Sequence, residues 1–235
     1  MTTKRSHAIW MLAGLLVASA PAWAQRGPHE RDGAFRLHVG AFQPEGDSEY
    51  WDDKFDDFTG DIDDFENISV GADYLLSLNR HLGLLFSGNH YQGDQTQAYL
   101  DFEDNFGNDI RHDTTLEITS LTGGLQFSFL GPDAPIIPYV GAGGGLYVWN
   151  LEENGDFIDF GSVNDEIFTA RLQSEGEAFG YYWLVGLEAP ITHRISVFGE
   201  ARWTNVDDEL DGDLPTLGDI DLGGREFLAG ISWNL

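Results

Sequence analysis

The chain has 235 residues, contains no cysteine and carries a formal net charge of −28. Without cysteine it has neither a disulfide framework nor a thiolate metal site. The excess of acidic residues excludes a nucleic-acid-binding protein, which needs a basic face. A chain of this length accommodates one domain or one closed barrel.

The N-terminus has the pattern of a secretory signal peptide. Lys4 and Arg5 precede an apolar run over 8–18, and the small residues Ala22 and Ala24 flank a predicted cleavage site. The apolar run is too short to span a bilayer. We therefore expect a signal peptide over 1–24 and a mature domain over 25–235. Removing Lys4 and Arg5 takes the net charge from −28 to −30.

Eight later segments alternate between large apolar residues and small or polar ones, which is typical of strands with two different faces. The predicted strands are 33–42, 67–77, 82–92, 114–130, 138–150, 178–188, 195–205 and 226–235. The last one places Phe227, Ala229, Ile231, Trp233 and Leu235 on one face. Because this alternation continues to the final residue, the last strand must pair along its whole length.

The fourth segment has an irregular phase. Leu116 and Ile118 alternate out of step with Leu121 and Leu125. A β-bulge near Thr119 would restore a single apolar face. Alternatively, the first part of the segment extends beyond the membrane, where the faces meet different surroundings.

The connections alternate between short turns and long, acidic segments. The short ones are 78–81, 131–137 and 189–194, and the long ones are 43–66, 93–113, 151–177 and 206–222. This asymmetry predicts an all-β fold: an eight-stranded antiparallel transmembrane barrel, an up-and-down meander with periplasmic turns and extracellular loops. A water-soluble barrel of the lipocalin kind is disfavoured, because the second face is small and sparsely charged.

Three segments carry a resemblance to a known superfamily. They are "PYVGAGGGLYVW" (138–149), "FLAGISWNL" (227–235) and "FRLHVGAF" (35–42). In these the chain resembles the small eight-stranded outer-membrane barrels of Gram-negative bacteria, such as the outer-membrane protein A barrel domain, outer-membrane protein W and the opacity-like surface proteins. The resemblance implies an outer-membrane location. Family members commonly end in Phe, whereas this chain ends in Leu235.

Six charged residues fall on the polar face and form a predicted lumen charge network: Arg36, Asp73, Glu188, Glu200, Arg202 and Glu226. An eight-stranded barrel is only wide enough for side chains to fill, so these charges must be paired or hydrated. They are either an ion-pair plug or a narrow, gated polar path. We expect Arg202 and Glu226 to stand opposite each other and to make contact, in competition with Glu200.

No set of residues indicates catalysis. Some barrels of this architecture modify lipid A, which requires a nucleophile and its partners at the membrane rim. The nearest candidates, His193 and Ser196, lie in a predicted periplasmic turn and lack a third partner. His90 and His112 flank the second long loop and are interpreted as solvated. The sequence therefore predicts that the protein is not an enzyme.

The first long loop is the most unusual segment, with eleven acidic residues against Lys54 alone between positions 45 and 66. Clustered carboxylates favour Ca²⁺ or Mg²⁺, and the candidate ligands are Asp52, Asp53, Asp56, Asp57, Asp61, Asp63 and Asp64. The simpler interpretation is a solvated anionic surface. The interleaved aromatic residues Trp51, Phe55, Phe58 and Phe65 indicate that the loop packs against itself or a partner.

Taken together, these patterns predict a monomeric outer-membrane barrel with a structural or surface-interaction role. Its expected partners are outer-membrane lipid, lipopolysaccharide and the barrel assembly machinery, with no nucleic acid and no cofactor other than weakly bound Ca²⁺ or Mg²⁺. The alternative is a small porin-like channel for cations or small hydrophobic solutes.

Overall fold

The computed structural model describes residues 32–159, 166–214 and 218–235, so the predicted signal peptide lies outside the described residues. The barrel strands are β1 (Gly33–Pro44), β2 (Asn67–Ser77), β3 (Leu82–Glu103), β4 (Asp109–Ser128), β5 (Ile137–Asp159), β6 (Glu166–Pro190), β7 (Ile195–Asn205) and β10 (Gly224–Asn234). The long connections add α2 (Glu49–Asp57), the 3-10 helix η1 (Ile62–Phe65) and a hairpin of β8 (Asp207–Glu209) and β9 (Asp219–Asp221). No helix in the described part of the chain is long and apolar enough to cross a membrane.

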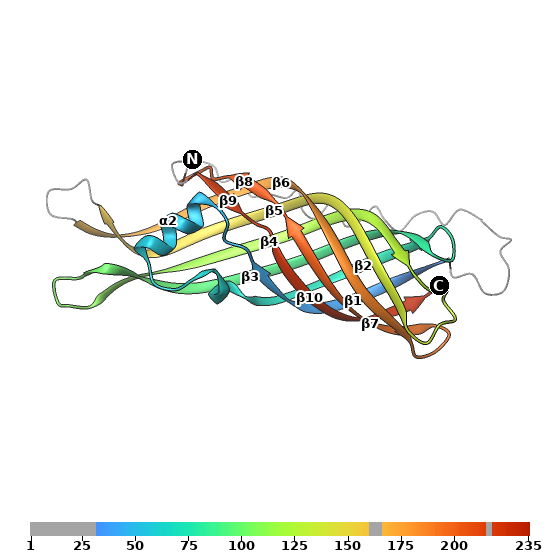
Figure 1. The fold of residues 1–235 in the computed structure, drawn as a ribbon. Helices are drawn as coiled ribbons and strands as arrows, with labels where there is room; N and C mark the ends of the chain where they lie inside the picture. Colours follow the sequence, from blue (N-terminus) through green and yellow to red (C-terminus); the bar gives the residue numbers. More distant parts are fainter. Residues whose placement is uncertain (1–31, 160–165, 215–217) are drawn as a thin grey trace. The chain divides into compact units, whose positions relative to one another are not determined.

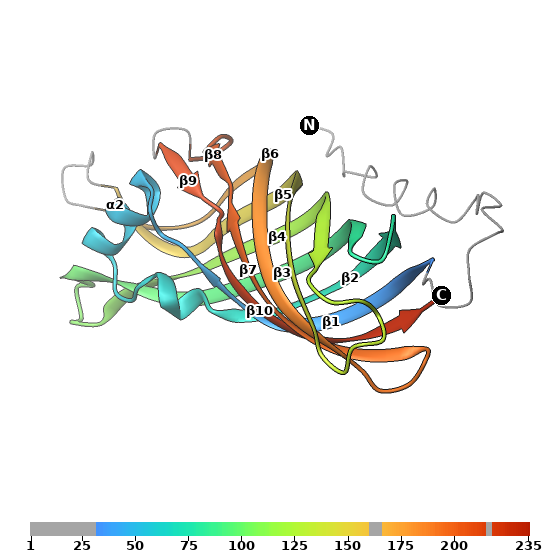
Figure 2. The ribbon, with the colours of Figure 1, turned by 45° about the vertical axis from the view of Figure 1, so that its right-hand side comes forward.

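The eight long strands form a closed antiparallel barrel, as predicted (Figures 1 and 2). The barrel closes where β1 pairs with β10, in a register that places Leu37 opposite Ile231. The chain end is fixed as the alternating pattern requires: the Leu235 N–H donates to the Gly33 carbonyl at 2.9 Å. No edge remains between the first strand and the last, so every strand of the ring has two neighbours.

The outer surface of the barrel carries a belt of exposed apolar side chains. On β1, Phe35, Leu37 and Val39 are exposed while Arg36 and His38 between them are buried. Within the belt, β6 exposes Phe179, Tyr181, Trp183, Val185 and Leu187. Apolar-out and polar-in alternation is the pattern of strands that face lipid on the outside.

Two predicted loops are largely strand. The ranges 93–113 and 151–177 continue as paired β3–β4 and β5–β6, with Gln92 opposite Glu117 and Asn150 opposite Glu175. Cross-strand polar pairs on the outer face stabilise these extensions; for example, Arg171 pairs with Glu152 at 2.5 Å. Their acidic composition suggested loops, but these segments are strands whose outer face is exposed to water.

The irregular phase of the fourth strand arises because its first part extends beyond the membrane, and not from a β-bulge. The β3–β4 register is continuous from Leu82–Phe127 to Ala98–Arg111, so there is no bulge near Thr119. Leu116 is 0% exposed and Leu121 is 53% exposed. The apolar side chains change from the outer to the inner face because β4 leaves the belt and enters a different environment.

This second environment is a core inside the projecting strands. The side chains of α2, η1 and the β8–β9 hairpin pack against the inner face of the extensions. The buried members include Tyr50, Trp51, Phe65, Leu116, Ile118, Trp149, Leu151, Leu210 and Ile220. Figure 1 shows α2 at the end where β3–β6 project, opposite the labelled C-terminus.

Candidate functional site

The six predicted charges all lie on the inner face of the barrel and are at most 5% exposed. Arg36, on β1, is fully buried and donates to Glu188 on β6 at 2.9 Å and to Gln126 on β4 at 3.0 Å. The ring faces of Tyr139 and Phe198 lie 5.3 and 5.1 Å from its guanidinium carbon. This arginine therefore links β1 to four other strands across the lumen, near the short-turn end.

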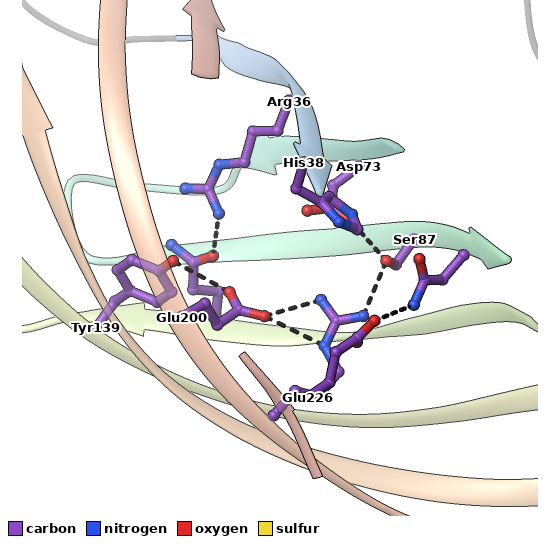
Figure 3. A network of polar contacts seen from close by, with 10 residues as sticks. Arg36, His38, Asp73, Ser87, Tyr139, Glu200 and Glu226 are labelled. Atoms are coloured by element: carbon purple, nitrogen blue, oxygen red, sulfur yellow. Dashed lines mark hydrogen bonds and ion pairs between the residues drawn. The ribbon is translucent and has the colours of Figure 1, made fainter. Parts of the chain in front are cut away.

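A second set of contacts lies deeper in the lumen (Figure 3). Arg202 donates to Glu200 at 2.9 Å and to the Ser87 hydroxyl at 3.2 Å. Ser87 in turn donates to Asp73, which lies 3.3 Å from Nε2 of His38. The Tyr139 hydroxyl donates to Glu200 at 3.0 Å. Arg202 thus contacts Glu200 directly and is connected to Asp73 through Ser87, which is how a buried charge is tolerated.

Arg202 pairs with Glu200, the predicted competitor, and not with Glu226. Arg202 and Glu226 stand opposite each other on β7 and β10, as expected. Arg202 nevertheless donates to Glu200, two positions away on the same strand and face. Glu226 accepts a hydrogen bond from Asn89. Residues two positions apart on one face of a strand are within reach of a guanidinium, and Glu226 has its own partner in Asn89.

Beyond this charged layer, toward α2, the inner surface of the barrel becomes apolar. Trp51 of α2 is 0% exposed, and its indole N–H donates to the Asp221 carbonyl on β9 at 3.1 Å. Its ring contacts those of Tyr50 and Phe65 at centroid distances of 4.7 and 5.2 Å. Helix α2 and the β8–β9 hairpin thus form an apolar plug over the polar layer.

A small cavity separates the two layers. It has a volume of about 30 Å³ and is lined by Asn89, Arg202 and Glu226 together with Tyr91, Tyr147 and other residues of the plug core. This volume holds roughly one or two water molecules. Side chains therefore occupy the described part of the lumen at two levels, and this cavity between them has space for solvent but not for a solute.

One ion pair is buried within the plug. Lys54 of α2 pairs with Glu153 of β5, and the Tyr50 hydroxyl donates to Glu153 at 2.7 Å. Burial lowers the pKa of Lys54, although Glu153 opposes the shift. Burial alone would raise the pKa of Glu153, but Lys54 and Tyr50 hold it below its usual range. His112 completes the group and is 1% exposed, so its interpretation as a solvated loop histidine was wrong.

The seven candidate metal ligands are all exposed: Asp52, Asp53, Asp56, Asp57, Asp61, Asp63 and Asp64. Three of them have structural partners. Asp61 and Asp64 form a capping box on η1, and Asp63 accepts from Gln43 at 2.7 Å. Within the described ranges, no three acidic or histidine side chains converge in a way that could hold a metal ion. The aromatic residues of this loop are packed by the protein itself.

The candidate catalytic residues do not form a site. Ser196 is fully buried and its hydroxyl accepts from Asn234 at 3.2 Å, whereas His193 is exposed. His90 lies on the outer face and contacts Thr119 at 2.9 Å. These side chains serve strand packing and turns.

Sequence reasoning placed His38 on the polar face of the first strand but left it out of the lumen charge network, and it missed the Lys54–Glu153–His112 group in the plug. Lys54 had a usable signal, because it is the only cation in the acidic run and lies between aromatic residues. Glu153 had none, because its own neighbourhood is acidic and glycine-containing. Its burial arises from α2, which lies 99 positions away in the chain.

Comparison with known proteins agrees with this geometry. The family model described as "Outer membrane protein beta-barrel domain" matches residues 11–234. The outer membrane protein OprG from Pseudomonas aeruginosa is 11% identical, with 88% of this chain and 98% of that one covered and a TM-score of 0.53. At this identity the likeness shows the fold alone.

Two further structures are similar at lower scores. Neisserial surface protein A is 11% identical, covers 86% of this chain and 96% of its own length, and has a TM-score of 0.47. The outer membrane protease OmpT from Escherichia coli is 11% identical, covers 90% and 99%, and has a TM-score of 0.43. A comparison with curated protein sequences finds no match.

Proposed function

Since the chain belongs to the outer membrane protein β-barrel family, we propose that it is a sealed, non-catalytic barrel that acts at the cell surface through its extracellular end. One observation carries this proposal: the lumen is filled at two levels, by the Arg36 and Arg202 networks and by the α2 plug. A solute path through the barrel would have to break both. The part of the chain beyond the belt is then the part free to interact.

Conductance is the discriminating measurement. We expect no stepwise current from the purified protein in planar bilayers. Replacing residues 47–64 and 207–221 with short Gly–Ser linkers removes α2 and the β8–β9 hairpin but leaves the charge networks in place, so this variant should also be silent. Adding Arg36→Ser, Glu188→Ser, Arg202→Ser and Glu200→Ser to it removes both charge networks and should open a path. Discrete conductance steps in the parent protein would instead favour a small channel.

The absence of catalysis is also part of the proposal. His193 and Ser196 are separated by exposure and by partners, and a nucleophile needs a base within hydrogen-bond reach. Incubation of the protein in lipopolysaccharide-containing vesicles should leave both lipid and added peptide unchanged. Hydrolysis that survives Ser196→Ala would point to another group, and hydrolysis lost in that variant would overturn the assignment.

The acidic outer surface supports a further part of the proposal, in which divalent cations bridge the loops to anionic lipopolysaccharide. Exposed, unclustered carboxylates bind such cations weakly, with dissociation constants of roughly 10⁻⁴ to 10⁻³ M. Calorimetry with Asp→Asn changes at Asp52, Asp53, Asp56 and Asp57 tests it, because these four have no capping role. The protein is expected to be a monomer delivered by the barrel assembly machinery.

A further inference from the structure

Three polar side chains from three elements meet beneath α2. Lys54 forms an ion pair with Glu153 of β5, and its ammonium nitrogen lies 3.1 Å from Nε2 of His112 on β4. The three residues are between 1% and 5% exposed. Lys54 is the only Lys or Arg between positions 45 and 66. Helix α2 therefore has a single cationic attachment to the wall behind it.

The geometry favours a neutral His112 ring. Lys54 is paired with Glu153, and a charged ammonium group has only donors, so Nε2 of His112 accepts from Lys54. The rings of Phe58 and Phe157 lie 4.5 and 5.1 Å from the imidazole and keep water away. Protonation of His112 would place two cations 3.1 Å apart beside one carboxylate.

We propose that this cluster is an acid-sensitive latch, in which protonation of His112 releases α2 from the inner wall of the β3–β6 extension. Release would expose the aromatic face of the plug and the apolar wall that it covers. The charge networks deeper in the lumen would stay in place, so the latch is independent of whether the barrel conducts.

The titration of His112 gives the direction of the effect. Burial, reinforced by Lys54, lowers its pKa from 6.5 to about 4 in the docked state. The undocked state therefore binds more protons between these values, and docking weakens as the pH falls through them. The full change corresponds to about 300-fold in the docking equilibrium. The lowered pKa of Glu153 acts in the same direction.

Other ionisable groups face the latch and do not all act alike. Asp113 on β4 favours the protonated form of His112, and Tyr50 and Tyr99 contact the cluster from α2 and β3. Asp221 on β9 does not contact the latch, but its backbone carbonyl accepts from Trp51 of α2. It has the opposite sign, because burial raises its pKa to about 6 and its protonation favours the packed loops. The contribution of His112 is therefore measured as a difference between matched variants.

The chain has no cysteine, so one introduced thiol is a unique reporter. Thr114 lies two residues from His112 on the same inner face and is 0% exposed. Asn154 is exposed on the extension. The ratio of the maleimide labelling rates of Thr114→Cys and Asn154→Cys proteins reports opening, because the pH dependence of thiol reactivity is common to both. We expect this ratio to rise at least about tenfold between pH 7.5 and pH 4.5.

Two changes in the Thr114→Cys and Asn154→Cys backgrounds test the cause. His112→Gln keeps an acceptor for Lys54 but cannot titrate, so most of the rise should disappear. Lys54→Met leaves Glu153 to pair with protonated His112, so acid should lower the ratio. Circular dichroism establishes that each barrel is folded. An unchanged rise in His112→Gln, a rise in Lys54→Met or no rise in the parent would each overturn the latch.

Discussion

The two halves of the barrel place their apolar side chains on opposite faces of the same strands. Within the belt, β4 places Leu121 and Leu125 outward and Thr122 and Gln126 inward. Beyond the belt, the same strand places Leu116 and Ile118 inward and polar residues outward, without a change of register. The half within the belt, the lower half, is thus polar inside and apolar outside. The half beyond the belt, the upper half, is the reverse.

The difference shows that the surroundings decide which face is apolar. Lipid covers the outer face of the lower half, so its lumen must satisfy charges. Water covers the outer face of the upper half, so its interior is a conventional core filled by α2, η1 and the β8–β9 hairpin. Substitutions in one half should therefore be tolerated differently from the same substitutions in the other.

The largest effect is expected in the lower half. Arg202→Met removes the partner of Glu200 from a site where both side chains are buried. Breaking a buried ion pair by removing one member costs about 3–5 kcal/mol. The measurement is the free energy of unfolding in lipid vesicles by denaturant titration.

Arg111→Met is the matched control, because Arg111 pairs with Asp109 in an exposed position of the upper half. Exposed pairs contribute at most about 1 kcal/mol. Arg202→Met combined with Glu200→Gln should recover part of the loss, since no uncompensated charge then remains. Equal costs for Arg202→Met and Arg111→Met would show that the lumen charges are hydrated instead of paired.

The next effect compares two leucines of β4. Leu116→Ala leaves a cavity in the upper core, and such changes cost about 2–5 kcal/mol. Leu121→Ala faces lipid, whose chains fill the space, so its cost should stay below about 1 kcal/mol because no cavity is left. Hydrogen exchange of the α2 amides should respond to Leu116→Ala alone. A larger effect from Leu121→Ala would contradict the proposed exchange of faces.

The barrel itself was predictable because its signal is local. Alternation of Phe35, Leu37 and Val39 with Arg36 and His38 needs only neighbouring residues to be recognised. The short turns and the closure of the last strand follow from the same pattern. The six lumen charges were found because they fall in phase with the polar positions of this alternation.

The upper half was less predictable because its buried contacts join residues that lie far apart in the sequence. Glu153 and His112 lie in acidic segments, which usually remain solvated, and only contact with α2 buries them. The phase change at Leu116 and Ile118 was visible in the sequence, but two explanations fitted it. The choice of Glu200 over Glu226 by Arg202 depends on side-chain reach, which register alone does not determine.

The third prediction concerns Asp221, at the boundary of the plug. Its raised pKa of about 6 means that its contribution to stability is present below the ordinary value of 3.8 and is lost as the pH rises through 6. Asp221→Asn should therefore protect the β8–β9 hairpin several-fold more against exchange at pH 8, and not at pH 4. Slower opening at both pH values would assign the effect to something other than ionisation.

The smallest effect separates capping from cation binding in the acidic loop. Asp61 caps η1 by accepting from the Asp63 N–H at 2.9 Å, and its own N–H donates to Asp64 at 3.2 Å. Loss of such a cap costs about 1 kcal/mol, and Asn caps nearly as well as Asp. Asp61→Ala should speed exchange of the η1 amides about fivefold, and Asp61→Asn should not, in the presence of a chelator. Asp56→Ala is the control for a lost exposed charge. If Asp61→Asn opens η1 as much as Asp61→Ala, and added Ca²⁺ closes it only in the parent, the carboxylate acts as a cation ligand and not as a cap.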